Sequence, residues 1–154
     1  MARDPIPTWY FALVVVRFGH RFLLVHERKH GSHWYLPAGR VESGETLVEG
    51  ARRETLEEAG IPIVIEGILR IEHQPFQEGQ ARLRIIFVAR PQDDTSPKRI
   101  PDEESLGAGW FSLEELNRLS LRGEEVRQIL QYVASGAPIY PLRLLTFEGA
   151  PYQV

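Results

Sequence analysis

The chain has 154 residues, which is a common length for one domain, and we expect residues 1–154 to fold as a single domain. It carries 18 Lys and Arg against 21 Asp and Glu, a net charge of −3, and it contains no cysteine. The mild acidity argues against a protein built to bind nucleic acid polymers through their phosphates. The lack of cysteine excludes disulfides, iron–sulfur clusters and thiol nucleophiles, so any metal must be held by oxygen or His nitrogen.

No segment of the sequence has the pattern of a membrane span or an export signal. The longest apolar run near the start covers residues 9–16, far short of the roughly 20 residues that span a bilayer. Asp4 and Pro5 stand where a signal peptide carries basic residues. We therefore expect a cytoplasmic protein without a membrane partner.

The first part of the chain predicts two strands, a loop and a helix. Residues 10–16 and 21–27 are apolar and flank a Phe-Gly-His turn, as in a β-hairpin. Residues 28–45 are rich in Gly and polar side chains, which predicts a loop with a short strand around 34–36. Thr46 and Glu49 form a capping box that opens a helix, and this helix should end at residue 59, just before Gly60.

The second part predicts two long strands followed by two helices. Residues 63–73 and 81–90 are strongly apolar, and residues 91–102 have the composition of an exposed loop. Trp110-Phe111 is expected in a short strand or turn. A second capping box, Ser112 and Glu115, should open a short helix to about residue 119. A last helix is expected over 123–134, followed by an irregular tail.

Three carboxylates share one face of the first helix. Glu54, Glu57 and Glu58 are spaced i, i+3 and i+4, so they lie within about 100° of one another. Like charges at this spacing repel, and anions are unfavourable in the C-terminal half of a helix. A hard divalent cation such as Mg²⁺ or Mn²⁺, which prefers oxygen ligands, would relieve both conflicts. The alternative is a solvated acidic face without a function.

The loop before the helix adds further polar groups. Gly39 follows a Leu-Pro-Ala segment and allows the backbone to approach another group closely. Glu45 stands just before the helix, and Arg53 lies next to Glu54. A pair between Arg53 and Glu45 would tie the loop to the helix and orient its ligands.

The spacing of these residues resembles the Nudix box, G-x5-E-x7-R-E-U-x-E-E-x-G-U with U apolar. Gly39 and Glu45 are followed by residues 53–61, Arg-Glu-Thr-Leu-Glu-Glu-Ala-Gly-Ile, and eight of the nine specified positions match. The departure is Thr55, where the pattern has an aliphatic residue. Its methyl group still suits a packing face.

The resemblance implies an α+β fold, an α/β/α sandwich with a mixed sheet, and hydrolysis of a phosphoanhydride bond with Mg²⁺ or Mn²⁺. It implies that Glu54, Glu57, Glu58 and the carbonyl of Ala38 hold metal, while Arg53 and Glu45 brace the helix. Many members add a carboxylate from a loop before a Trp-Phe pair. Glu104 is the best match, with Glu103 as the neighbouring alternative and an ordinary acidic loop as the other interpretation. Either Glu104 or Glu58 would act as general base.

Substrate-binding residues are sought on the strands beside the box. Arg84 alternates with apolar neighbours, so it either meets a phosphate or is an exposed strand charge, and Arg82 shares its face. Trp34 and Tyr35 could stack on a base, although aromatic residues near loops also serve as packing.

The flanks and tail are similar to the NudJ-like branch of the family. That resemblance implies a phosphatase of nucleoside di- and triphosphates or thiamine-type pyrophosphates. We expect a small phosphorylated substrate and a monomer or homodimer. Two alternatives stay open. One is a sanitising hydrolase of oxidised nucleoside triphosphates that releases pyrophosphate, and the other is a catalytically silent binding module, which would be expected to have lost box carboxylates.

Overall fold

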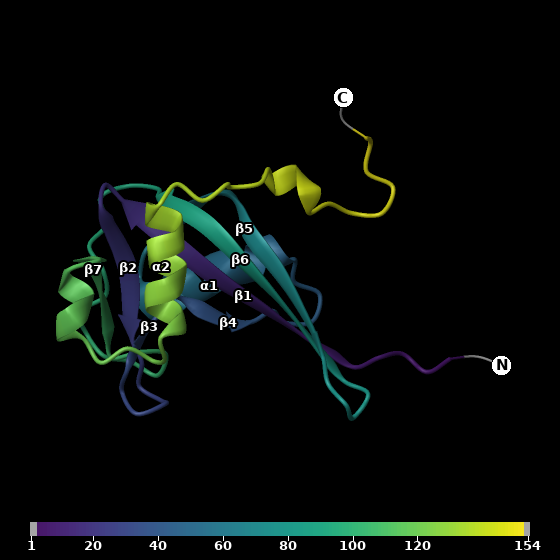
Figure 1. Ribbon diagram of the computed structural model, residues 1–154, viewed down its shortest axis with the longest axis horizontal. Coiled ribbons are helices and arrows are strands. Elements are labelled where there is room, and N and C mark those ends of the chain that lie inside the picture. Colours follow the sequence, from purple (N-terminus) through teal and green to yellow (C-terminus); the bar gives the residue numbers. More distant parts are fainter. Residues whose placement is uncertain (1–2, 153–154) are drawn as a thin grey trace.

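The computed structural model describes residues 3–152 and consists of one mixed sheet between two helices (Figure 1). In chain order the elements are β1 (Thr8–Phe18), β2 (Arg21–His26), β3 (Trp34–Tyr35), β4 (Ala38–Arg40), α1 (Leu47–Ala59), β5 (Ile63–Pro75), β6 (Ala81–Pro91), β7 (Gly107–Ser112), the 3₁₀ turn η1 (Glu115–Arg118), α2 (Glu125–Ala134) and the 3₁₀ turn η2 (Leu142–Leu144).

The central strand of the sheet is β1, which is buried on both faces. It pairs in parallel with β6 and antiparallel with β4 and, at its end, with β2, and the strand order is β3-β2-β1-β6-β5. Alternate residues of β1 point to opposite faces, so Ala12 and Val14 pack with α1 whereas Leu13 and Val15 pack with α2. This two-sided burial explains the unbroken apolar run in the sequence.

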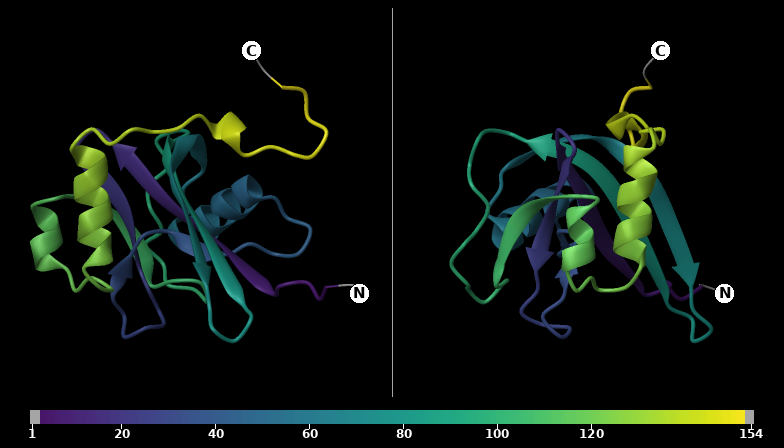
Figure 2. Two further views of the ribbon diagram at one scale, coloured as in Figure 1. Left: turned by 45° about the vertical axis from the view of Figure 1, so that its right-hand side comes forward. Right: turned by 60° about the vertical axis from the view of Figure 1, so that its left-hand side comes forward.

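The two helices lie on opposite faces of the sheet, as the two views of Figure 2 show. The predicted α/β/α arrangement with a mixed sheet is therefore confirmed. Across the described residues, no helix combines the length and the apolar character that crossing a membrane requires.

Several local predictions hold and others need correction. Thr46 caps α1 by accepting the Glu49 amide hydrogen at 3.0 Å, and Gly60 ends the helix in the left-handed conformation. The predicted loop over residues 28–45 is wrong in part, because residues 38–40 form β4 along β1. The last helix begins at Glu125, two residues later than predicted.

The segments after β6 are also more ordered than their composition indicates. Trp110-Phe111 belongs to β7, a six-residue strand whose partner is β2. The tail is not wholly irregular, since Tyr140 exchanges two backbone hydrogen bonds with Ile68 of β5 before η2 begins.

Candidate active site

Helix α1 packs its small residues against the sheet and carries its carboxylates on an adjacent face. Ala51, Thr55 and Ala59 are fully buried on the side that contacts the sheet. Thr55, the residue that departs from the box pattern, satisfies its hydroxyl by donating to the Ala51 carbonyl at 2.8 Å. The departure is thus accommodated within the helix. The Glu54 and Glu58 carboxylates lie beside this buried face, against Gly39 and Ala38 of β4.

Gly39 of β4 lies directly against the carboxylate of Glu54. A Cβ atom added to Gly39 would stand 2.1 Å from Cδ of Glu54, which is far inside van der Waals contact. The expected close approach at Gly39 is confirmed, and its partner is a carboxylate of the helix. A larger residue at this position would therefore displace the Glu54 carboxylate.

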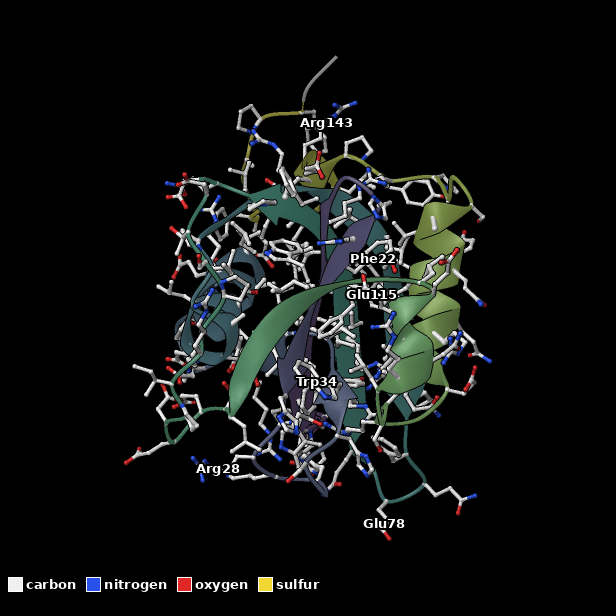
Figure 3. The ribbon with its side chains drawn as sticks, turned by 90° about the vertical axis from the view of Figure 1, so that its left-hand side faces the viewer. Phe22, Arg28, Trp34, Glu78, Glu115 and Arg143 are labelled. Atoms are coloured by element: carbon white, nitrogen blue, oxygen red, sulfur yellow. The ribbon has the colours of Figure 1, made fainter. Side chains whose placement is uncertain are left out.

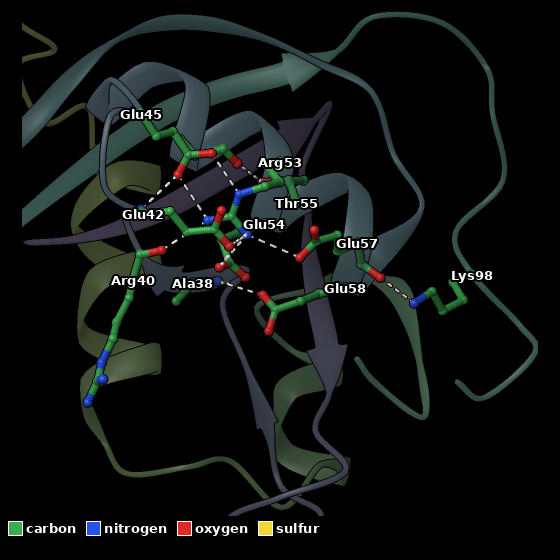
Figure 4. A network of polar contacts seen from close by, with 11 residues as sticks. Ala38, Arg40, Glu42, Glu45, Arg53, Glu54, Thr55, Glu57, Glu58 and Lys98 are labelled. Carbon is green, nitrogen blue, oxygen red and sulfur yellow. Dashed lines mark hydrogen bonds and ion pairs between the residues drawn. The ribbon is translucent and has the colours of Figure 1, made fainter. Parts of the chain in front are cut away.

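Arg53 connects the loop to the helix through a network of charged hydrogen bonds (Figure 4). Its guanidinium donates to both carboxylate oxygens of Glu45, at 2.7 and 3.0 Å. It also donates to Glu54 at 2.9 Å, to Glu57 at 3.2 Å and to the Arg40 carbonyl at 3.0 Å. The hydrogen bond from Arg53 holds the pKa of the Glu45 carboxyl below its usual range.

Glu58 is the most buried carboxylate of the helix face. It accepts the amide hydrogen of Ala38 at 2.9 Å. Burial raises the pKa of Glu58 to about 8 despite this hydrogen bond, and the charges of Glu54, Glu27 and Glu104 add to the rise. Several carboxylates thus lie close together, and within residues 3–152 no cationic side chain forms an ion pair with Glu58.

The C-terminal end of α1 carries no basic residue of its own, and the loop after β6 supplies the missing partners. Lys98 donates its ammonium to the Glu57 carbonyl and its amide to the Ala59 carbonyl at 2.8 Å. Ser105 donates its hydroxyl to the Glu58 carbonyl at 2.6 Å. These bonds satisfy carbonyls that a helix end leaves unpaired. The segment over residues 91–102 is mostly exposed, as predicted, and together with Ser105 it also caps α1.

The same loop holds Glu104 near the helix carboxylates. Asp102 binds Lys98 at 2.7 Å and accepts the amide hydrogens of Glu104 at 2.9 Å and Ser105 at 3.2 Å. The hydrogen bond from Lys98 lowers the pKa of Asp102 to about 2. Glu104 is close enough to raise the pKa of both Glu54 and Glu58.

A cavity of about 600 Å³ lies beside this cluster. Among the residues that sequence reasoning singled out, it is lined by Tyr35, Ala38, Gly39, Glu58, Arg82, Arg84, Glu103 and Glu104. The cavity is not lined by Glu45, Arg53, Glu54 or Glu57, which belong to the hydrogen-bond network around Arg53. A larger cavity of about 800 Å³ lies between the start of α1 and residues 145–147, but none of the Glu54, Glu57 and Glu58 carboxylates lines it.

Two of the three predicted substrate-binding residues reach the cavity, and one does not. Trp34 stacks on His26 at 4.7 Å and meets the Phe111 ring edge-on, so it lies among packed side chains beside β2 (Figure 3). The structure does not bring Trp34 to the cavity. Trp34 lies away from the cavity because it is paired with His26 in the β2–β3 register.

Tyr35 and Arg84 line the cavity, yet both are engaged with a residue of α2. Tyr35 donates its hydroxyl to Glu125 at 3.2 Å, and burial raises its pKa to about 12. Arg84 binds Glu72 at 2.7 Å and also pairs with Glu125. The carboxylates of Glu72 and Glu125 neutralise the charge of Arg84.

Sequence reasoning missed Glu27, which lines the cavity just after β2. One of its carboxylate oxygens accepts from Arg122 at 3.0 Å, and Arg122 in turn lies 4.6 Å from the Tyr35 ring centre. Arg122 is 95 positions away in the chain, so no local pattern marks the pair.

Comparisons with known proteins agree with this geometry. The NUDIX domain family model matches residues 7–132. The human 8-oxo-dGDP phosphatase NUDT18 is 38% identical over 116 residues, which cover 73% of this chain but only 34% of the relative. Phosphatase NudJ from Shigella boydii is 33% identical over 140 residues and 90% of each chain. A NUDIX hydrolase structure from Nitrosomonas europaea aligns with a TM-score of 0.75 and 29% identity, over 94% of this chain and 99% of that one.

The likeness to NudJ spans nearly the whole chain. The family model covers all strands from β1 to β7, the box on α1 and most of α2. The chain therefore belongs to the Nudix hydrolase family, whose enzymes act on phosphoanhydride bonds.

Proposed function

We propose that this enzyme hydrolyses a phosphoanhydride bond in a small nucleoside di- or triphosphate, or in a thiamine-type pyrophosphate, with the help of Mg²⁺ or Mn²⁺. The observation that carries the proposal is the 600 Å³ cavity, because carboxylates and arginines line it together. A volume of this size suits a small-molecule ligand. A polyphosphate with a divalent cation complements both kinds of charge.

The residues present fit a divalent cation. The donors are hard carboxylate oxygens, which Mg²⁺ and Mn²⁺ prefer. Within residues 3–152, Oε1 of Glu27 is buried without a hydrogen-bond partner. Burial, together with the charges of Glu54, Glu27 and Glu104, raises the pKa of Glu58. In this structure Glu54 and Glu57 turn toward Arg53, and within residues 3–152 no group of three acidic or His side chains is arranged to hold a metal ion.

We propose that the cation is held by the carboxylates of Glu54, Glu57, Glu58 and Glu104 and by the carbonyl of Ala38. When bound, the cation would supply positive charge to the phosphate oxygens and promote ionisation of water. Glu58 or Glu104 takes the proton from the attacking water as general base. Arg53 and Glu45 keep the carboxylates in place through the network described above.

Substitution of the helix carboxylates tests this assignment. Glu57→Gln and Glu58→Gln should each lower Mg²⁺-dependent kcat by about 100-fold or more, because each removes a charged group from the chemistry. The thermal midpoint should stay the same or rise, since like-charge repulsion is relieved. Glu49→Gln, on the exposed first turn of the same helix, is the matched control and should change neither quantity. Wild-type turnover in either variant would refute the role of that residue.

A substrate panel distinguishes the finer possibilities. The human relative is named for 8-oxo-dGDP, so the panel should contain dGDP, 8-oxo-dGDP, 8-oxo-dGTP and thiamine pyrophosphate. Orthophosphate release from a triphosphate supports the phosphatase proposal, whereas pyrophosphate plus a monophosphate supports a sanitising hydrolase. No Mg²⁺-stimulated release from any member would indicate a binding module and refute the proposal.

A further inference from the structure

Two buried side-chain atoms within residues 3–152 make no hydrogen bond, and both belong to residues that line the candidate active site. They are Oε1 of Glu27 and Nε of Arg82. One can only accept and the other can only donate. A buried polar group without a partner destabilises a folded protein, so each of these two atoms calls for an explanation. A ligand that carries both positive and negative charge would satisfy both.

Arg82 differs from the other cavity arginine of its strand. Arg84, two positions along β6, is neutralised by Glu72 and Glu125. For Arg82, no carboxylate of the described chain comes within ion-pair distance. Its guanidinium is instead held 5.7 Å from the ring centre of Phe11 and 5.9 Å from that of Phe76. Aromatic faces orient a guanidinium without cancelling its charge.

A second guanidinium lies against the same aromatic ring. Arg40 is opposite Phe11 in the β1–β4 register and lies 5.9 Å from its ring centre. Arg40, Phe11 and Arg82 all line the cavity, as do Glu58 and Glu104. Uncompensated cations from the sheet and uncompensated carboxylates from α1 and its capping loop thus share one enclosure.

We propose that Arg82, rather than Arg84, is the arginine of β6 that binds a phosphoryl oxygen of the substrate. The assignment rests on the proposed function, since it takes the ligand to be a di- or triphosphate. Nε and a terminal nitrogen of a guanidinium present parallel donors to two oxygens of one phosphate, and a lysine cannot reproduce this fork. Phosphate binding would give the buried Nε–H its missing acceptor.

Binding of methylenediphosphonate in the presence of Mg²⁺ tests the proposal without turnover. Its P–C–P linkage resists hydrolysis, and isothermal titration calorimetry gives the affinity. Arg82→Gln should weaken binding by about 10- to 100-fold, the range expected for a lost hydrogen bond to a charged group. Arg84→Gln should lower the thermal midpoint, because it removes the ion pairs of Arg84 with Glu72 and Glu125, and should weaken binding less than Arg82→Gln. Arg90→Gln, on the exposed end of the same strand, should bind like wild type.

Wild-type affinity in Arg82→Gln, or a larger loss in Arg84→Gln, would overturn the proposal. If Arg82→Gln fails to fold, Arg82→Lys replaces it. This variant should still bind methylenediphosphonate more weakly than wild type, because the two parallel donors of the guanidinium are lost. Unchanged affinity in Arg82→Lys would equally overturn the proposal. The proposed function fails separately, if the wild type releases no phosphate from the substrate panel. Weaker diphosphonate binding by Arg82→Gln would then still support an anion site at Arg82.

Discussion

Ser105→Ala isolates the contribution of one buried hydrogen bond at the end of α1. Ser105 is fully buried, and its hydroxyl donates to the Glu58 carbonyl at 2.6 Å. Alanine fits the same space but leaves that carbonyl without its donor. An unsatisfied buried acceptor costs about 1–3 kcal/mol of unfolding free energy. For a chain of this length, each kcal/mol corresponds to about 2–4 °C, so the thermal midpoint should fall by about 2–12 °C.

The chain offers a matched control for this substitution at the end of α2. Ser135 also donates its hydroxyl to a carbonyl at a helix end, that of Tyr132 at 2.7 Å, but Ser135 is exposed. After Ser135→Ala, water replaces the donor, so the loss should stay below about 0.5 kcal/mol. Both variants are compared with wild type by thermal and urea unfolding without added metal. If Ser105→Ala loses no more stability than Ser135→Ala, the loop does not satisfy the end of α1 as inferred.

Two further substitutions test the site and its surroundings. Gly39→Ala should displace the Glu54 carboxylate, whose Cδ would lie 2.1 Å from the new Cβ. The value of kcat/KM for the best panel substrate should fall by about 100-fold, because misplacement of an active-site group by about 1 Å can cost that much. Unchanged kinetics would show that Glu54 can move freely. Tyr35 has its pKa raised to about 12 by burial, so the folded state retains a proton that the unfolded state loses near pH 10. Stability should therefore fall by about 2–3 kcal/mol between pH 10 and 12, and Tyr35→Phe should lack this part of the decline in urea titrations; parallel curves for the two proteins would refute the shift.

The sequence was sufficient to predict α1, the helix that carries Glu54, Glu57 and Glu58. Thr46 and Gly60 mark its ends by local capping chemistry, and the i, i+3, i+4 spacing places Glu54, Glu57 and Glu58 on one face. The Arg53–Glu45 pair was also predictable, because both residues belong to one short segment. All of these features depend on residues close together in the chain.

The partners of these residues were less accessible to sequence reasoning. Trp34 and Tyr35 are neighbours, but strand alternation sends one into packing against His26 and the other to the cavity, and the sequence could not tell which. Arg84 had the right strand position for a phosphate ligand. Its neutralisation depends on Glu125, 41 residues away on a helix whose packing decides the contact.

The sequence by itself determined the central helix, its carboxylate face and the brace by Arg53, and the lack of cysteine limits the ligands of any metal to oxygen or His nitrogen. Only the tertiary structure decided that Lys98 and Ser105 cap this helix, that Glu27 joins its carboxylates, and that Arg82 keeps its charge while Arg84 is neutralised. The physical reason is range. Capping, helical spacing and composition are local, whereas burial, charge compensation and the fate of each polar atom depend on groups that only folding brings together.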